Sequence, residues 1–399
     1  MKILVLNAGS SSLKYTVYEG AELEMLAKGV VEKIGDSGGK ITQKYRKDKL
    51  VKEVTIEETV ADHYQAIQMI VSLLSDKEHG VIKDISEIDI IGHRVVHGGE
   101  FFSAPRLIDK KLKKKIKELI PLAPLHNPPN LMGINVSEEI FPQATQVAVF
   151  DTAFHQTIPT FAHRYAIPKK LYKKYGIRVY GMHGTSHSYV TGTAAKYLEK
   201  APNEVNLITI HLGNGCSISA VRDGKCIDTS MGFSPLPGLV MGTRSGDIDP
   251  SIIFHLIRQH GYSSQEVETL LNKKSGLKGL TGLTDLRDIH SQIEKGDKEA
   301  KLALDIYCYR IKKYIGAYYA AVGPLDAIVF TAGVGENDGS VRKAVLEGLD
   351  HLGIQLDEEE NNKTLPGLRE IQGPESKIKV LIVPTDEEKQ IALSALKFH

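Results

Sequence analysis

The hydrophobic and polar positions of the chain form two kinds of segment. Short apolar runs rich in Val and Ile, each close to a turn of glycine or small polar residues, have the pattern of buried strands. These runs are Ile3–Leu6, Ile88–Ile91, Val147–Phe150, Leu207–Leu212, Ile328–Phe330 and Val380–Val383. Between them, Val60–Leu74 and Leu302–Ala321 place apolar residues three and four positions apart, as a helix packed on a core does. Strands that alternate with helices predict an α/β fold.

One strongly basic stretch, Asp109–Lys117, has the composition of a nucleic-acid-binding patch. Leu112, Ile116 and Ile120, however, recur every four residues and place one apolar stripe beneath a lysine-covered face. No aromatic residue lies among the lysines. The pattern favours a solvated amphipathic helix over an RNA-binding surface.

An internal repeat divides the chain near its middle. Ile3–Gly20 aligns without a gap with Leu207–Gly224, at an offset of 204 residues. Both segments have the pattern of a strand, a turn of small residues, a second strand and an acidic-glycine hairpin turn. Short hairpins can match by chance. We favour the alternative of two related domains, each beginning with a hairpin whose loop faces a common cleft.

The composition narrows the class of protein. A length of 399 residues fits about two domains, and 42% apolar with 25% charged residues excludes a disordered or fibrous chain. The formal net charge of +1 leaves no overall field to attract nucleic acid or membranes. Three cysteines without CxxC spacing predict a reducing compartment rather than a disulfide framework. Apolar runs too short for a signal peptide or a membrane helix predict a soluble, cytoplasmic protein.

Three loops rich in small residues have the composition of anion-binding turns. The first contains Ser10–Ser12 and precedes Lys14, the second is Gly213–Gly215, and the third, Gly333–Asn337, is predicted as a turn after a strand. Small residues let a ligand approach the backbone amides. The third loop departs from the GxGxxG pattern at Asp338, and no Walker A motif is present. Walker-type NTPases are therefore excluded, although loops that face each other across a cleft can still cradle a nucleotide.

Polar residues in glycine-flanked segments are the candidates for chemistry. Arg94 and Arg244 each lie in such a segment, Asp151 ends a strand, and His183 follows Gly181-Met182. A lone arginine would favour a structural salt bridge. Two arginines in glycine-flanked loops favour the binding of a phosphoryl group and a carboxylate.

Two histidine pairs have the four-residue spacing of a helical zinc site. His93 and His97 form the first pair, and His183 and His187 the second. Neither pair carries the HExxH glutamate, and the first pair lies in a stretch predicted as strand, where this spacing separates the rings. We therefore expect no zinc site, and we expect His187 to pack or to orient another group.

Eight motifs in chain order resemble those of one family, the acetate kinases, within the acetokinase group of short-chain carboxylate kinases. Any one of them alone would be a weak signal, whereas eight in order along essentially the whole chain are specific. The motifs are Asn7–Lys14, His93–Gly99, Pro124–Pro128, Phe150–His155, His183–His187, His211–Gly215, Gly242–Asp247 and Gly333–Asn337.

The resemblance implies a fold and an activity. The family belongs to the superfamily of sugar kinases, heat-shock chaperones and actin, which implies two duplicated ribonuclease-H-like (actin-like ATPase) domains with a nucleotide cleft between them. We expect an N-terminal domain of residues 1–151 plus 387–399 and a C-terminal domain of residues 152–386. The implied reaction is reversible, Mg²⁺-dependent phosphoryl transfer from ATP to acetate, giving acetyl phosphate and ADP. The implied protein is a cytoplasmic homodimer with no nucleic-acid or membrane partner.

Two alternatives stay open. The substrate could be propionate or another short-chain carboxylate instead of acetate. A protein of a different class, a nucleotide-gated binding or chaperone-like module of the same superfamily, would need an additional peptide-binding domain.

The resemblance also assigns site residues by position. Asn7 and Glu387 would hold the metal, and His126 and Asn214 would assist positioning. Arg94 would bind the acyl group. The catalytic residues would be Asp151, His183 and Arg244, and the acyl pocket would consist of Val96, Leu125, Met182 and Pro235. The residues expected to contact ATP are Lys14, His211, Leu212, Gly213, Asn214, Gly215, Asp285, Leu286, Arg287, Gly333, Val334, Gly335, Glu336 and Asn337.

The role of Asp151 and three departures from the family bear on this assignment. Acetate is already ionised at pH 7 and needs no base, so Asp151 either transfers a proton or orients Arg94 or the metal. The chain departs from the family at Asp386, where asparagine is usual, at Met182, where an aromatic residue is common, and in Gly282–Arg287, which is one residue shorter. The branched side chain of Val96 predicts acetate ahead of propionate, with butyrate poor.

Overall fold

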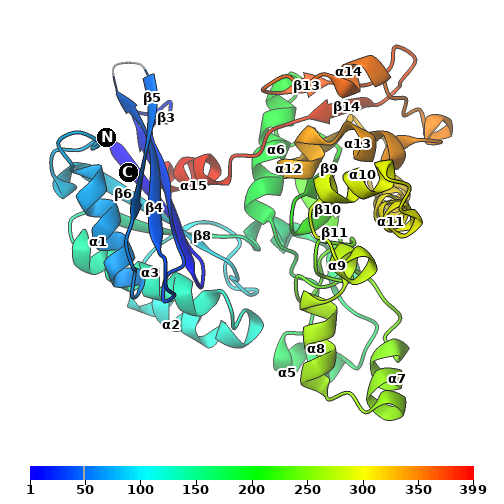
Figure 1. Cartoon of the computed structure of the whole chain (residues 1–399), viewed down its shortest axis with the longest axis horizontal. Helices are drawn as coiled ribbons and strands as arrows, with labels where there is room; N and C mark the ends of the chain where they lie inside the picture. The colour runs from blue at the N-terminus through cyan, green and yellow to red at the C-terminus, as the bar shows by residue number, and fades with distance from the viewer. Residues whose placement is uncertain (48–49) are drawn as a thin grey trace. The chain divides into compact units, whose positions relative to one another are not determined.

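The computed structural model describes residues 1–47 and 50–399, and the chain divides into two compact units (Figure 1). Unit 1 contains Met1–Ala153 and Asp386–His399, and unit 2 contains Phe154–Thr385. Each unit has a mixed β-sheet with helices packed against it, which confirms the α/β prediction. In the part of the chain that the structure describes, no helix combines the length and apolar character needed to span a bilayer.

The sheet of unit 1 has eight strands within the described residues, in the order β5-β4-β3-β2-β1-β6-β8-β7. Strands β1 to β5 form an antiparallel meander, β6 pairs parallel with β1, and β8 pairs parallel with β6. The short edge strand β7 is antiparallel to β8. The strands are β1 (Lys2–Ala8), β2 (Ser12–Glu19), β3 (Glu24–Glu32), β4 (Lys40–Lys47), β5 (Leu50–Glu57), β6 (Ile88–Val95), β7 (Arg106–Leu107) and β8 (Thr145–Phe150).

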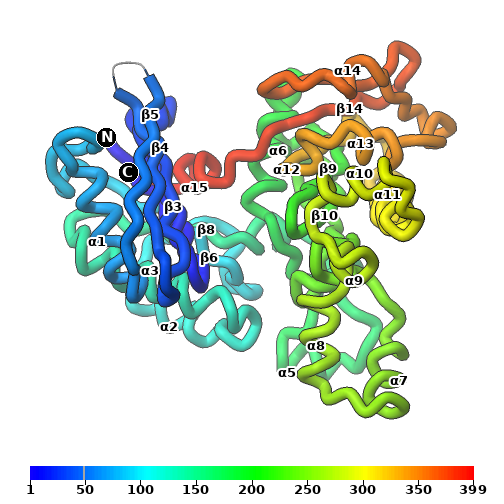
Figure 2. The backbone as a smooth tube through the Cα atoms, in the orientation of Figure 1, coloured from blue at the N-terminus to red at the C-terminus, as the bar shows by residue number. Residues whose placement is uncertain are grey.

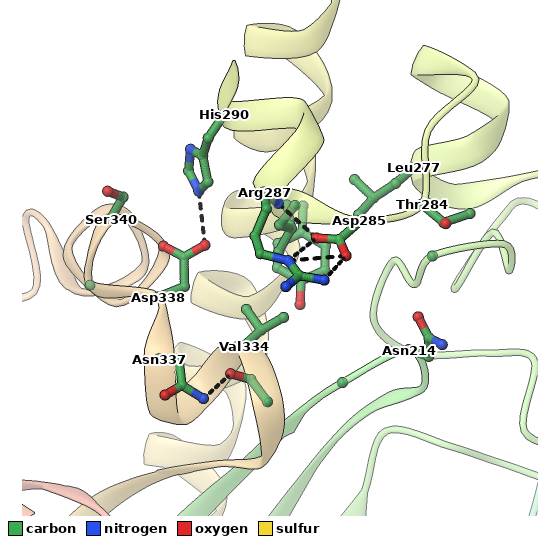
Figure 3. A pocket seen from close by; sticks show the side chains of 16 residues that line it. Asn214, Leu277, Thr284, Asp285, Arg287, His290, Val334, Asn337, Asp338 and Ser340 are labelled. Carbon is green, nitrogen blue, oxygen red and sulfur yellow. Dashed lines mark hydrogen bonds and ion pairs between the residues drawn. The ribbon is translucent and has the colours of Figure 1, made fainter. Parts of the chain in front are cut away.

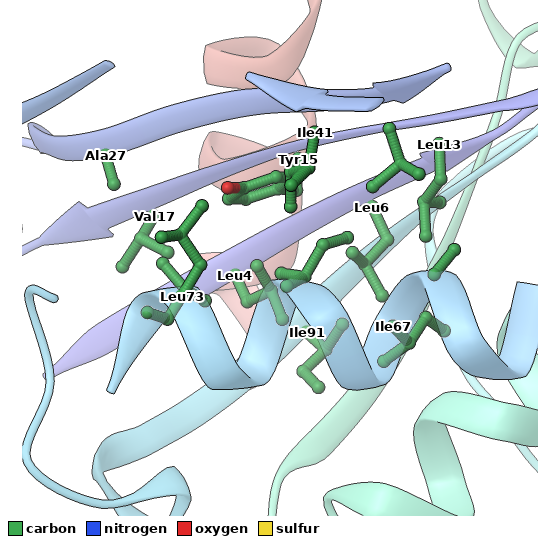
Figure 4. Packing of buried hydrophobic residues seen from close by; sticks show 14 of the residues in the cluster. Leu4, Leu6, Leu13, Tyr15, Val17, Ala27, Ile41, Ile67, Leu73 and Ile91 are labelled. Atoms are coloured by element: carbon green, nitrogen blue, oxygen red, sulfur yellow. The ribbon is translucent and has the colours of Figure 1, made fainter. Parts of the chain in front are cut away.

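Helices cover both faces of this sheet. They are α1 (His63–Leu74), α2 (Lys110–Glu118), α3 (Asn127–Ile140) and α15 (Glu387–Ala395), with 3₁₀ turns at Ile85–Glu87, Ile120–Leu122 and Leu396–Phe398. Successive side chains of a strand point to opposite faces. Leu4 and Leu6 of β1 therefore pack with α1 (Figure 4), whereas Ile3 and Val5 pack with α15. Burial on both faces explains why β1 is almost continuously apolar.

The C-terminal helix α15 returns to the N-terminal strands and belongs to unit 1 (Figure 2). Ile391 lies so close to β6 that a β-carbon at Gly92 would be 2.7 Å from its Cγ2 atom. A larger residue at Gly92 would displace the helix. This close packing fixes Glu387, the first residue of α15, on unit 1.

The sheet of unit 2 has six strands in the order β11-β10-β9-β12-β14-β13. They are β9 (Leu207–Leu212), β10 (Cys216–Arg222), β11 (Lys225–Thr229), β12 (Ala327–Thr331), β13 (Arg369–Glu370) and β14 (Lys379–Ile382). Helix α6 (Gly184–Tyr197) packs on one face through Val190, Ala194 and Ala195. Helix α11 (Lys298–Val322) lies against β10 on the other face, where Tyr307 contacts Cys216.

The remaining helices of unit 2 are shorter. They are α4 (Thr160–His163), α5 (Lys169–Tyr175), α7 (Ser251–His260), α8 (Ser264–Lys273), α9 (Gly276–Thr281), α10 (Leu286–Glu294), α12 (Ala332–Asn337), α13 (Gly339–Leu346) and α14 (Glu358–Asn362). The 3₁₀ turns are Ala153–Thr157, at the junction of the units, and Asp350–Leu352.

The two sheets share one topology, which confirms the predicted duplication. In both, an antiparallel three-stranded meander (β3-β2-β1 and β11-β10-β9) continues into two parallel strands and a short antiparallel edge strand. The gapless alignment is one residue out of register in the second strand. Leu4 pairs with Val17, whereas Ile208 pairs with Ala220. The cause is the number of residues between the last paired positions: residues 9–12 separate Ala8 from Leu13 in unit 1, whereas only residues 213–215 separate Leu212 from Cys216 in unit 2.

Most predicted elements are confirmed, and two are wrong. The six apolar runs lie in strands, with Val383 one residue beyond β14, and the basic stretch forms α2 with Leu112 and Ile116 buried. The segment Gly333–Asn337 is not a turn, because it forms most of helix α12. His97 is not in a strand, because β6 ends at Val95.

Candidate functional site

A cluster of polar side chains in unit 1 centres on Arg94, near the end of β6. Its Nη2 atom donates to Asp151 Oδ2 at 2.8 Å, and its Nη1 atom donates to Asn7 Oδ1 at 3.3 Å. Asn7 is on β1 and Asp151 follows β8, so three neighbouring parallel strands supply the cluster at their carboxyl ends. Burial opposes the charge of Arg94, but the negative charges of Asp151 and Glu387 outweigh it and raise the pKa of Arg94.

Glu387 supplies a second carboxylate to this cluster. Burial raises its pKa to about 7, and repulsion from Asp151 and Glu388 adds to the effect, against the attraction of Arg94 and Lys14. Lys14 is opposite Asn7 in the β1–β2 pairing. Asp386, the departure from the family, caps α15, because its side chain accepts from Lys389 N at 2.9 Å. Aspartate is as good an N-cap as asparagine, so this substitution has a structural explanation.

The predicted acyl-pocket and positioning residues differ in exposure. In unit 1, Val96 is buried and its amide donates to Asn130 Oδ1 at 2.9 Å. Leu125 is 67% exposed, and His126 is exposed at the N-terminal end of α3. In unit 2, Met182 is buried and Pro235 is half-buried.

Unit 2 contains a pocket of about 660 Å³ that the predicted nucleotide segments line (Figure 3). Among the predicted residues it brings together Gly213, Asn214, Asp285, Leu286, Arg287, Gly333, Val334 and Asn337. Its lining does not include His211, Leu212, Gly215, Gly335 or Glu336, which lie in the same segments, nor Lys14 of unit 1. The pocket is also lined by residues that were not predicted to contact ATP, namely Gly242, Leu277, Thr284, His290, Tyr307, Asp338, Gly339 and Ser340.

The walls of this pocket are held by local hydrogen bonds. Asp285 caps α10, accepting from Arg287 N at 2.9 Å, and also accepts from the Arg287 side chain, which lowers the pKa of Asp285 to about 2. Farther along α10, His290 Nε2 lies 2.8 Å from Asp338 Oδ2, and Asp338 caps α13. Figure 3 shows both pairs. Asp338 is the residue at which the chain departs from the GxGxxG pattern, and it directly follows the predicted segment Gly333–Asn337.

The predicted catalytic residues of unit 2 flank the loop Gly213–Gly215. A β-carbon at Gly215 would lie 3.2 Å from His183 Nε2 and 3.7 Å from Arg244 Nη1. The imidazole of His183 stacks on that of His211, with ring centroids 4.3 Å apart. Arg244 donates from Nη1 to the Pro235 carbonyl at 3.1 Å, and burial lowers its pKa. No acidic side chain of the described residues forms an ion pair with Arg244.

The histidine pairs make contacts that do not resemble a metal site. His93 Nε2 lies 2.7 Å from the side-chain oxygen of Gln146, and the Gly99 amide donates to His97 Nδ1 at 3.0 Å. His187 is buried between Thr209 and Ser217. The three cysteines are buried free thiols.

Comparison with known proteins decides the family. The model of the acetokinase family matches residues 2–393. The chain belongs to the acetokinase family. Curated relatives include the acetate kinase of Oleidesulfovibrio alaskensis, 52% identical over 397 residues and 99% of each chain. The acetate kinase of Clostridium botulinum strain Okra is 51% identical over 393 residues and 98% of each chain.

Solved structures of the family have the same fold. The crystal structure of Porphyromonas gingivalis acetate kinase matches with a TM-score of 0.94 and 44% identity over 99% of both chains. A propionate kinase from Francisella tularensis matches with a TM-score of 0.92 and 42% identity over 99% of both chains. The match along nearly the whole chain confirms the resemblance inferred from the motifs.

Proposed function

We propose that this protein is an acetate kinase, which reversibly transfers the γ-phosphoryl group of ATP to acetate and forms acetyl phosphate and ADP. The observation that carries the proposal is the pocket of unit 2. Three of the four segments that the acetokinase resemblance assigns to ATP line this pocket, although they are far apart in the sequence. A chaperone-like module has no such support, because the family match extends over residues 2–393.

The pocket suits a nucleotide in size and chemistry. A volume of about 660 Å³ is within the range of small-molecule sites. Leu277, Leu286 and Val334 offer apolar surface to a base, while Asn337 and Ser340 offer polar groups. Gly213 and Gly333 leave the backbone open to a ligand.

Arg94 is proposed to bind the acyl group. The planar guanidinium matches a carboxylate or a phosphoryl group, and its side chain is 18% exposed. Because acetate is ionised, its oxygen attacks the γ-phosphorus without a base. A bond forms between that oxygen and phosphorus, the bond to the β–γ bridging oxygen breaks, and the electron pair leaves with ADP.

Asp151 is proposed to orient Arg94 rather than to transfer a proton. Its carboxylate is 1% exposed and accepts a hydrogen bond from the Arg94 guanidinium. A carboxylate held in this way is a poor base, and the reaction requires none. Arg244 and His183 are proposed to stabilise the phosphoryl group in flight, whose charge is spread over three oxygens. The half-buried guanidinium of Arg244 lacks an ion pair within the described chain, which suits the binding of an anion.

The residues proposed for Mg²⁺ fit a hard cation. Asn7 and Glu387 offer amide and carboxylate oxygens, which Mg²⁺ prefers in proteins. Burial raises the pKa of Glu387, and repulsion from Asp151 and Glu388 adds to the effect. A divalent cation would relieve that repulsion. When bound, Mg²⁺ supplies neutralisation of the phosphate charge.

The assembly is also a proposal. We propose that residues 1–151 with 387–399, and residues 152–386, act as the two ATPase domains, and that the protein is a cytoplasmic homodimer, as the family resemblance implies. Light scattering of the purified protein tests the dimer directly.

The activity is tested by trapping acyl phosphate as hydroxamate. With Mg-ATP we expect product from acetate, less from propionate and little from butyrate. No product from any of the three acids would contradict the proposal. A clear preference for propionate would favour the propionate alternative.

The nucleotide pocket is tested by filling it. Gly333 is exposed in α12, and a β-carbon there meets nothing within 4 Å. Gly333→Leu should therefore keep the fold and lower ATP affinity about tenfold or more, because the new side chain enters the pocket. Gly316→Leu is the matched control, since Gly316 is an exposed glycine of α11 with the same open space. Equal ATP affinity in both variants would show that the nucleotide binds elsewhere.

A further inference from the structure

Four side chains of unit 2 form a hydrogen-bonded row that ends on His183. Thr209 Oγ1 of β9 lies 2.8 Å from His187 Nδ1. His187 Nε2 lies 2.8 Å from Ser217 Oγ of β10, and Ser217 Oγ lies 2.9 Å from His183 Nδ1. Thr209, His187 and Ser217 are fully buried. The row therefore connects the interior of the sheet to the residue that flanks Gly215.

The Ser217 hydroxyl allows only two arrangements of protons. Its side-chain partners among the described residues are His183 and His187. A hydroxyl has one proton and two lone pairs. If Ser217 accepted from both histidines, its own buried proton would have no acceptor among these partners, so Ser217 donates to one histidine and accepts from the other. Burial, and the nearby imidazoles of His155, His211 and His183, lower the pKa of His187, which is therefore neutral and carries one proton.

Thr209 selects between the two arrangements. In the first, Thr209 donates to His187 Nδ1, His187 Nε2 donates to Ser217, and Ser217 donates to His183 Nδ1. Every buried donor then has an acceptor. In the reverse arrangement Thr209 accepts from His187, and its hydroxyl proton has no acceptor within the described part of the chain. A buried donor without an acceptor costs about 1–3 kcal/mol, so the first arrangement is favoured.

We infer that Thr209, His187 and Ser217 are positioning residues that hold His183 as a neutral imidazole with its proton on Nε2. An Nδ1 atom that accepts from Ser217 cannot carry a proton, so Nε2 is the donor. This nitrogen faces the loop glycine, because a β-carbon at Gly215 would lie 3.2 Å from it. The donor is thus directed to the loop that also approaches Arg244.

The backbone supports the same role. His183 has a φ of 56°, a left-handed conformation that is unfavourable for a residue with a side chain. The strain is maintained because the ring is fixed on both sides, by stacking on His211 and by the hydrogen bond to Ser217. The consequence for catalysis rests on the proposed kinase function. A neutral Nε2–H donates to a phosphoryl oxygen without waiting for protonation.

Heteronuclear NMR of protein labelled at the histidine nitrogens tests the proton position without using activity. The His183→Asn variant identifies the signals of His183 by their disappearance. We expect wild-type His183 to be neutral at pH 7, with its proton on Nε2. A proton on Nδ1, or a charged ring, would overturn the inference even if the protein is an active kinase.

Variants test whether the row is the cause. Ser217→Ala removes the donor to Nδ1, so we expect a mixture of His183 tautomers and a kcat lowered about tenfold or more, with the KM for ATP unchanged within about twofold. Ser219→Ala is the matched control, because Ser219 is equally buried two residues along β10 and bonds to Thr229 instead. We expect this control to keep the wild-type tautomer and turnover.

Thr209→Val provides a second variant should Ser217→Ala fail to fold. It keeps the shape of the side chain and removes the first donor, so both histidines should lose their single tautomer. If either Thr209→Val or Ser217→Ala keeps one Nε2-protonated form and matches Ser219→Ala in kcat, the row does not position His183. If all variants lack kinase activity, as would follow from a wrong functional proposal, the tautomer measurement still decides.

Discussion

The ion pair between Arg94 and Asp151 predicts a loss of stability that accompanies any loss of activity. Asp151 is 1% exposed and Arg94 is 18% exposed, so solvent reaches only one partner. Removing one partner of a buried pair costs about 3–5 kcal/mol, because a charge remains in a poorly solvated site. The partial exposure of Arg94 places Arg94→Ala at the lower end, about 3 kcal/mol.

This loss is measurable by thermal unfolding. For a domain of this size, 1 kcal/mol corresponds to about 2–4 °C, so the transition of unit 1 should fall by about 6–12 °C. Arg46→Ala is the matched control, because Arg46 and Glu24 form an exposed pair with 44% and 58% exposure. Exposed pairs contribute about 0.2–1 kcal/mol, so this variant should unfold almost as the wild type does.

A second substitution separates stability from function. In Arg94→Ala/Asp151→Asn the unpaired charge of Asp151 is removed, and much of the lost stability should return. Turnover should not return, because the guanidinium that binds the acyl group is absent. If Arg94→Ala unfolds like the wild type, or if Asp151→Asn brings no recovery, the ion pair is not the source of stability that its burial indicates.

Three further predictions address other parts of the molecule. Arg244→Ala should remove about 2.7–4 kcal/mol of transition-state stabilisation, measured from kcat/KM. It should lower the free energy of unfolding by only about 1 kcal/mol, because the substitution leaves no carboxylate unpaired. A much lower melting temperature with normal turnover would instead indicate a structural role. Burial lowers the pKa of His93 and of His97 to about 4 from 6.5, so the unfolded state binds protons first as the pH falls. The contribution of each histidine to the free energy of unfolding should therefore be full above pH 6.5 and decline towards pH 4, by about 3 kcal/mol for each histidine. Denaturant titrations at several pH values should show that His93→Gln reduces the dependence of the unfolding free energy on pH, and an unchanged dependence would contradict the assignment. Val96→Ala should raise the kcat/KM of propionate relative to acetate by about 1 kcal/mol or more, since one methylene in an apolar pocket is worth about 1–3 kcal/mol; no relative gain would remove Val96 from the acyl pocket.

The sequence alone predicted the fold class and the duplication. Apolar runs such as Leu207–Leu212 could be predicted as strands, because a strand that is buried on both faces is apolar at nearly every position. The repeat is detectable in the hairpins because both sheets contain the same antiparallel arrangement of their first strands. Motifs of contiguous residues identified the acetokinase family, which the comparisons confirm.

Several local features depend on tertiary contacts and could not be predicted. Gly333–Asn337 has the composition of a turn, yet it begins a helix directly after β12, and Arg342 of α13 donates to the Gly335 carbonyl. The hairpin register differs by one residue, because loop length is decided by the turn and leaves no trace in a hydrophobic pattern.

The site shows the same division between sequence and structure. The family motifs assigned roles to Arg94, Asp151 and Asn7. Only the pairing of β1, β6 and β8 shows that Asp151 and Asn7 both lie within hydrogen-bond distance of Arg94. Tyr307 and Ser340 of the pocket were missed, because a lining residue needs no special identity, only a position beside the cavity. The direction that we infer for the hydrogen bonds from Thr209 to His183 likewise rests on tertiary structure, namely on which buried donors have an acceptor. These are properties of residues far apart in the chain, which a sequence records only when it repeats a known motif.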